Sequence, residues 1–103
     1  MMDTKQFSRY FKAFSDQSRL TILQLLSGGE MTVGEITAKL GLAQPTVSRH
    51  LAILRAADVV HDRREGQQVI YSLNRKAVSI CCTGFCDCLK VEPVLRGKSR
   101  PKK

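Results

Sequence analysis

The spacing of apolar residues along this chain changes period once, near residue 58, and this change limits the possible folds more than any other feature. Before it, apolar residues recur three or four positions apart, as on one face of a helix. After it, residues 59–64 and 67–73 have the pattern of two strands around a hairpin turn at Glu65-Gly66. The sequence therefore predicts a mainly helical domain with a β-hairpin near its end.

Cap-type residues, prolines and glycines mark the ends of the predicted helices. Residues 15–18 (SDQS) supply caps for the second helix, and Gly28-Gly29 ends it. Gln44-Pro45 opens the fourth, because Pro is favoured at the first helical position. The predicted helices cover about residues 4–14, 20–26, 33–40 and 44–57, and a segment that begins near Asn74.

The third and fourth predicted helices are joined by a short turn at Gly41-Leu42, and the hairpin follows them. This is the element order of a winged helix-turn-helix, in which the second helix of the pair enters the major groove of DNA. The apolar residues of that helix lie at i, i+4 and i+7: Val47, Leu51 and Leu54. At about 100° per residue, Pro45, Arg49 and Ala52 then face away from the core.

The exposed side of this helix and the hairpin supply the candidates for DNA contact. The candidates are Gln44, Thr46, Ser48, Arg49 and His50 on the helix, and Arg63 and Arg64 at the hairpin. Gln suits adenine and Arg suits guanine by bidentate pairing, and hydroxyl groups bond to bases or phosphates. His50 lies close to the buried edge, where a structural role or a backbone-phosphate contact is expected. The two hairpin arginines are expected to approach the sugar-phosphate backbone or the minor groove.

The positive net charge of the chain indicates an acidic partner, of which nucleic acid is the leading candidate. The 103 residues carry a net charge of +8, and residues 90–103 hold six Lys/Arg against one Glu. We expect a folded domain over residues 1–89 and a basic, flexible tail over residues 90–103, which is either a solubilising end or an arm that contacts DNA. No apolar run approaches a membrane span and no signal peptide is evident, so a cytoplasmic location is expected.

All four cysteines lie within eight positions: Cys81, Cys82, Cys86 and Cys88. Cytoplasmic thiols stay reduced, so a disulfide framework is disfavoured, and the spacing is not that of a structural zinc site. Thiolates select soft, thiophilic ions. On a continuous helix Cys81 and Cys88 are about 10 Å apart in rise, which is too far for one ion to join them. We therefore predict that the chain turns between them at Thr83-Gly84, since Gly tolerates the backbone angles that end a helix.

Several stretches resemble the ArsR/SmtB family of metalloregulatory repressors over roughly residues 5–80. They are residues 14–23 (FSDQSRLTIL), 44–51 (QPTVSRHL) with Leu54-Arg55, 64–66 (REG) and 71–73 (YSL). The resemblance implies a homodimeric winged-helix repressor, in which the first and last helices form the interface and an inducer ion releases operator DNA. It does not imply an enzyme.

The resemblance also suggests where the inducer binds. Thr32 and Gly34 stand where many arsenic-responsive members carry cysteines, and neither histidine lies on the last helix, where zinc-responsive members have ligands. Some arsenic-responsive relatives carry an adjacent cysteine pair and a third cysteine seven positions after the first. Residue for residue, that pattern implies that As(III) or Sb(III) binds Cys81, Cys82 and Cys88, with Cys86 as an extra ligand, a redox partner or a bystander.

Other functions stay open at this point. The same fold could respond to thiol oxidation, or to Cd(II) or Pb(II), because sulfur-rich sites separate soft metals only loosely. A small thiol reductase is disfavoured, since the chain lacks a thioredoxin-like Cys-x-x-Cys and a βαβ order. Constitutive DNA packaging would instead bind DNA regardless of sequence.

Overall fold

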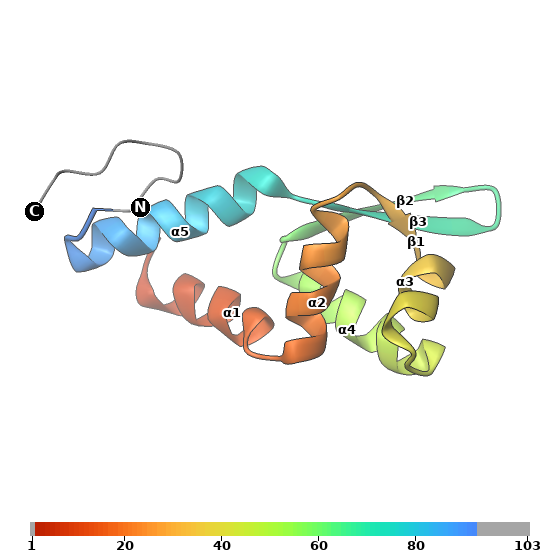
Figure 1. Cartoon of the computed structure of the whole chain (residues 1–103). Helices are drawn as coiled ribbons and strands as arrows, with labels where there is room; N and C mark the ends of the chain where they lie inside the picture. The colour runs from red at the N-terminus through yellow and green to blue at the C-terminus, as the bar shows by residue number, and fades with distance from the viewer. Residues whose placement is uncertain (1, 93–103) are drawn as a thin grey trace, which may run out of the picture.

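The computed structural model describes residues 2–92 of the chain (Figure 1). The elements are α1 (Thr4–Phe14), α2 (Gln17–Leu26), β1 (Met31–Thr32), α3 (Val33–Leu40), α4 (Gln44–Ala56), β2 (Val60–Glu65), β3 (Gln68–Leu73) and α5 (Arg75–Leu89). Most of the tail predicted over residues 90–103, including the part from Gly97, lies outside the described residues. Within residues 2–92, no helix is both long enough and apolar enough to span a bilayer.

Most helix starts are held by side-chain caps. In α1, α2, α3 and α5 the residue before the helix accepts a hydrogen bond from the backbone N–H three positions on: Asp3, Asp16, Thr32 and Asn74. In α3 the bond is reciprocal, because Glu35 also accepts from the backbone N–H of Thr32 at 2.8 Å. Helix α4 begins instead at Gln44-Pro45, as the sequence predicted.

The core lies between α2, α3, α4 and the sheet, and it confirms the winged helix-turn-helix. Each of these three helices buries at least one apolar residue fully, as does the start of β2; examples are Ile22, Ile36, Leu51 and Val60. Gly41 has a φ of 69°, which ends α3 in the left-handed conformation and directs the chain into α4. Figure 1 shows the β2–β3 ribbon projecting at one end of the molecule, with α1 and α5 side by side at the other.

The sheet has three antiparallel strands in the order β1-β3-β2. The pairing of Glu65 with Gln68 leaves Gly66-Gln67 as the turn, one position later than predicted, with Gly66 at a φ of 60°. Strand β1 was not predicted, because its two residues are too few to display a period. Met31 pairs with Tyr71, so β1 ties the start of α3 to the wing strands.

The predicted turn at Thr83-Gly84 is wrong, because α5 is one unbroken helix from Arg75 to Leu89. It ends at Lys90, which has a φ of 61°. The N–H of Lys90 donates to the carbonyl of Asp87 at 3.1 Å, and that of Val91 to the carbonyl of Cys86 at 2.9 Å. This is a Schellman ending, and it places all four cysteines inside the helix.

Gly84 lies inside the helix because α1 approaches α5 closely there. A Cβ at this position would lie 3.2 Å from Met2 Cε and 3.5 Å from the ring of Phe7. The next residue, Phe85, packs edge-on against Phe7 and Phe11, with ring centroids 5.5 and 4.7 Å apart. Gly84 therefore gives the room in which these two helices meet.

The substitution Gly84→Ala tests whether α5 is a continuous helix at this position. Alanine in a helix interior is favoured over glycine by about 1 kcal/mol. The end of the Met2 side chain is flexible and can move away from the added Cβ. We expect the free energy of unfolding to rise by up to about 1 kcal/mol, measured by urea denaturation. The double variant Met2→Ala/Gly84→Ala removes the closest contact and is the control. A loss of stability in both variants would contradict the continuous helix.

Candidate nucleic-acid interface and cysteine site

The faces of α4 are those that the sequence predicted. Val47, Leu51 and Leu54 are fully buried. The residues on the other sides are exposed: Gln44, Thr46, Ser48 and Arg49. The helix thus presents polar donors and acceptors to the outside, while its apolar side is fixed against the core. Contact of these side chains with DNA stays a prediction.

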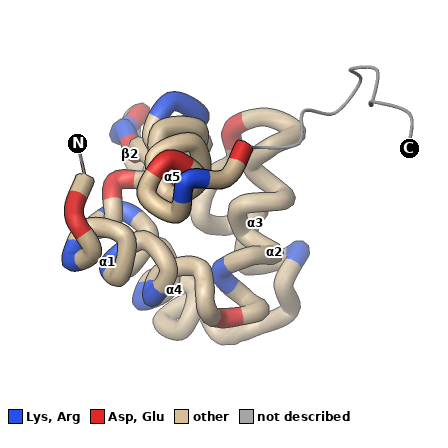
Figure 2. Tube along the Cα trace, turned by 90° about the vertical axis from the view of Figure 1, so that its left-hand side faces the viewer, with Lys and Arg blue, Asp and Glu red and all other residues tan. Residues whose placement is uncertain are grey.

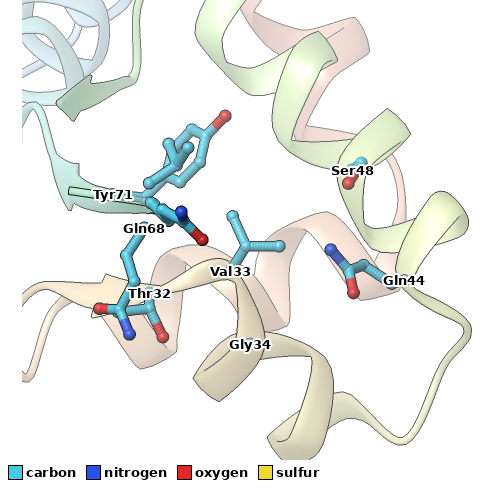
Figure 3. Close-up of a pocket in the computed structure, with 9 residues that line it drawn as sticks. Thr32, Val33, Gly34, Gln44, Ser48, Gln68 and Tyr71 are labelled. Atoms are coloured by element: carbon cyan, nitrogen blue, oxygen red, sulfur yellow. The ribbon is translucent and has the colours of Figure 1, made fainter. Parts of the chain in front are cut away.

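A hollow of about 410 Å³ lies between α4, the start of α3 and the wing (Figure 3). Gln44 and Ser48 line its α4 side, and Gln68 and Tyr71 line its β3 side. The recognition helix and the wing are therefore two walls of one concave surface. Gln67 in the hairpin turn and Gln68 at the start of β3 also line the hollow. Neither was among the predicted residues, although two adjacent glutamines at the hairpin were a visible signal.

His50 faces Arg19 and Asp16 rather than solvent. Its side chain is 15% exposed, and its Nδ1 lies 3.2 Å from Arg19 Nη1 and 3.8 Å from Asp16 Oδ2. The Asp16 carboxylate caps α2 by accepting from the backbone N–H of Arg19, and this bond holds the pKa of Asp16 below its usual value. The charges of His50 and Arg19 act in the same direction. Of the two roles predicted for His50, this placement supports the structural one.

Arg19 connects three helices. Its Nε donates to the carbonyl of Ala13 at 2.8 Å and its Nη2 to that of Lys12 at 3.2 Å, both in the last turn of α1. Through Nη1 the same guanidinium meets His50 in the middle of α4. Arg19 therefore sets the position of the recognition helix relative to α1.

The two arginines of the wing, Arg63 and Arg64, differ in their ion pairs. Arg63 is held by Glu30, with Nη–Oε distances of 2.7 and 2.8 Å, and also donates to Glu65 at 3.3 Å. These bonds raise the pKa of Arg63 above its ordinary value and lower the pKa of Glu30. Arg64 has no ion-pair partner among residues 2–92. Arg64 can thus approach a phosphate directly, whereas Arg63 would first have to leave its carboxylates.

The unbroken helix separates the four cysteines into two pairs. At about 100° per residue, Cys81 and Cys88 fall on one side of α5 and Cys82 and Cys86 on another. Cys81 is fully buried, and burial raises the pKa of its thiol, as does the neighbouring Cys82. Cys82 and Cys88 are exposed and Cys86 is partly exposed. In the described part of the chain, no three metal-ligating side chains converge, so the predicted trio of Cys81, Cys82 and Cys88 is not brought together.

A helix-turn-helix with a polar recognition helix beside a β-wing defines a winged-helix DNA-binding regulator. The chain matches the family "Bacterial regulatory protein, arsR family" over residues 16–62. It is 50% identical over 64 residues to the transcriptional repressor SdpR of Bacillus subtilis, covering 62% of this chain and 71% of SdpR. It is 36% identical over 96 residues to the arsenical resistance operon repressor of Escherichia coli, covering 87% and 82% of the two chains.

Solved structures agree with these matches. HlyU from Vibrio cholerae superposes with a TM-score of 0.67 at 33% identity, over 82% of this chain and 95% of HlyU. Matches to several other relatives span only about half of those proteins. The chain belongs to the ArsR family and is a DNA-binding transcriptional repressor, not an enzyme.

Replacing Arg19 by Met should destabilise the domain and weaken its binding to operator DNA. The change removes the bonds to two α1 carbonyls and to His50, and we expect the free energy of unfolding to fall by about 1–3 kcal/mol. Chemical denaturation and operator titration measure the two effects. Lys39→Met, at an exposed position of α3, is the control and should change stability by less than about 0.5 kcal/mol. Equal effects of both variants would show that Arg19 has no such role.

Proposed function

We propose that this repressor leaves its operator when trivalent arsenic, or antimony, binds thiolates of α5. The observation that carries the proposal is that all four cysteines lie on α5, which packs against α1 through Phe85. The names of two relatives support arsenic: the arsenical resistance operon repressor of E. coli and ArsR1 of Pseudomonas putida, an arsenic resistance transcriptional regulator. Soft thiolates suit As(III) and Sb(III) chemically.

The DNA-binding half of the proposal uses the concave surface of α4 and the wing. Gln44, Thr46, Ser48 and Arg49 read bases or bind phosphates, and Arg64 contacts the backbone beside the wing. Arg63 joins the interface only if it exchanges Glu30 for a phosphate, and His50 acts by holding α4. Two copies of the chain would place two recognition helices on a palindromic operator, about one helical turn apart.

The homodimer is proposed to form through α1 and α5. Apolar side chains on these helices are exposed in the single chain, among them Phe11 at 38% and Ile80 at 49%. Leu89 at the end of α5 and Val91 just after it are further exposed apolar residues. A second copy would cover side chains that water otherwise contacts, which is favourable at about 25 cal/mol per Å² of apolar area.

Three-thiolate binding requires α5 to change. With α5 helical to Leu89, Cys81 and Cys88 remain about 10 Å apart in rise, and one ion cannot join them. We infer that binding at Cys81, Cys82 and Cys88 unwinds the last turns of the helix. Gly84 and the left-handed Lys90 both weaken those turns.

Unwinding would reach the proposed interface directly. Phe85 lies between Cys82 and Cys88 and packs on Phe7 and Phe11 of α1, so a change in this part of α5 displaces an aromatic contact. A coupling of about 1–3 kcal/mol between inducer and operator is enough for a useful response.

A thiol-redox response is the second candidate, and one feature favours it. Cys82 and Cys86 lie one turn apart on the same side of α5, with at least partial exposure. At this spacing Cβ atoms are about 5–6 Å apart, whereas a disulfide needs about 3.5–4.5 Å, so oxidation would also distort the helix. Cd(II) and Pb(II) stay open as alternative ions.

Cysteine variants separate these functions. In an operator-release titration under reducing conditions, As(III) and Sb(III) should release the wild-type protein, and Cys82→Ser/Cys88→Ser should abolish the release. Cys86→Ser is the matched control and should respond to As(III) like the wild type. Parallel titrations with Cd(II), Pb(II), Zn(II) and peroxide test the alternatives. Arsenic release that survives in the double variant would exclude this site.

Gly84→Ala should also weaken the response. If As(III) binding unwinds α5, stabilising the helix by about 1 kcal/mol raises the As(III) concentration at half release about fivefold. Operator affinity without As(III) should stay unchanged, and fluorescence anisotropy of labelled operator DNA measures both. An unchanged midpoint in a variant of confirmed higher stability would contradict unwinding.

A further inference from the structure

Helix α1 carries a basic stripe that none of the roles above uses. Lys5, Arg9 and Lys12 follow one another at i, i+4 and i+7, all exposed, and α1 contains no Asp or Glu. At about 100° per residue the three lie within about 60° of one another. The ring contacts of Phe7 and Phe11 with α5 are on the opposite side of α1. The side chains of the stripe therefore take no part in the ring contacts between α1 and α5.

The stripe borders a groove between α1 and α4. The groove has a volume of about 340 Å³. Cations line one part of it and small apolar residues the other: Arg9, Lys12 and Arg19, and Ala13, Ile53, Ala56 and Ala57. Among residues 2–92, no carboxylate lines it. Because Arg19 is already bonded to two carbonyls and His50, Arg9 and Lys12 are the cations available to a ligand.

The groove continues the exposed face of the recognition helix. Arg49, Ile53 and Ala56 are spaced i, i+4 and i+7, so one line of exposed residues runs along α4 from its DNA-reading part to the groove. Residues of both α1 and α4 line the groove, and Figure 2 shows Lys and Arg positions along α1. An extended anion that contacts Arg49 can therefore follow α4 to reach α1.

We propose that Arg9 and Lys12, extended by Lys5, bind the sugar-phosphate backbone of the operator next to the groove that α4 reads. This inference rests on the proposed operator binding and enlarges its surface to a third helix. Phosphate contacts need positive charge at the right place rather than a shaped set of acceptors, which suits long, exposed basic side chains over an apolar floor.

Counterion release makes the proposal measurable. Each phosphate neutralised on B-DNA contributes about 0.9 to the slope of log affinity against log salt concentration. The double variant Arg9→Gln/Lys12→Gln should therefore lower the slope by about 1.8 per bound subunit. Its affinity should fall by a similar factor on operator and on random DNA, because backbone contacts carry no sequence information. Fluorescence anisotropy over a salt series measures both quantities.

The double variant Lys76→Gln/Lys90→Gln is the matched control, since it removes the same charge at exposed positions, one on α5 and one at its C-cap. Equal slopes for the two double variants would overturn the proposal, as would a loss of affinity confined to the operator. Ethylation interference gives a second readout, in which the α1 variant should lose sensitivity at specific phosphates and the control should not. If the wild type fails to prefer any operator over random DNA, the proposed function fails instead, which is a separate outcome.

Discussion

The contact between α1 and α5 is the interaction on which the rest of this structure depends. Phe85 is packed against Phe7 and Phe11, and Gly84 gives the backbone of α5 room beside α1. Because the contact falls among the cysteines, it keeps α5 helical there and holds Cys81 inside the domain. The same contact orients α1, which carries the partly exposed Phe11 proposed for dimerisation and, on its opposite side, the basic stripe.

A continuous series of contacts leads from the cysteines to the recognition helix. Phe85 touches α1, and the last turn of α1 accepts two hydrogen bonds from Arg19. Arg19 in turn meets His50 in the middle of α4. In the proposed mechanism, a movement of α5 would act on α4 through one aromatic contact and one guanidinium, while the wing stays attached to β1 and the core. The basic stripe lies on the intermediate helix, so the same movement would also shift Arg9 and Lys12.

The sequence predicted well those features that depend on residues close together in the chain, namely the helix bounds and the helix faces. The caps and the helical period gave the bounds of α1, α3 and α4 to within a residue, and the exposed faces of α4 followed from three apolar positions. The candidate residues Gln44, Ser48 and Arg49 are exposed for that reason. The sequence did not reveal pairings between distant residues, such as Arg63 with Glu30 or Arg19 with His50, which are 33 and 31 positions apart.

Gly84 shows why the cysteine site was harder to predict than the DNA-binding helix. In the sequence, a glycine between cysteines is equally consistent with the end of a helix and with a place where another helix approaches closely. Only the position of α1 in the structure decides between these two interpretations. The outcome changes the chemistry of the proposed site. Cys82 and Cys88 are exposed to an incoming ion, whereas Cys81 is buried with a raised thiol pKa. In the proposed mechanism, the third thiolate becomes available only when α5 opens, so binding of the ion and loss of the contact with α1 become a single event.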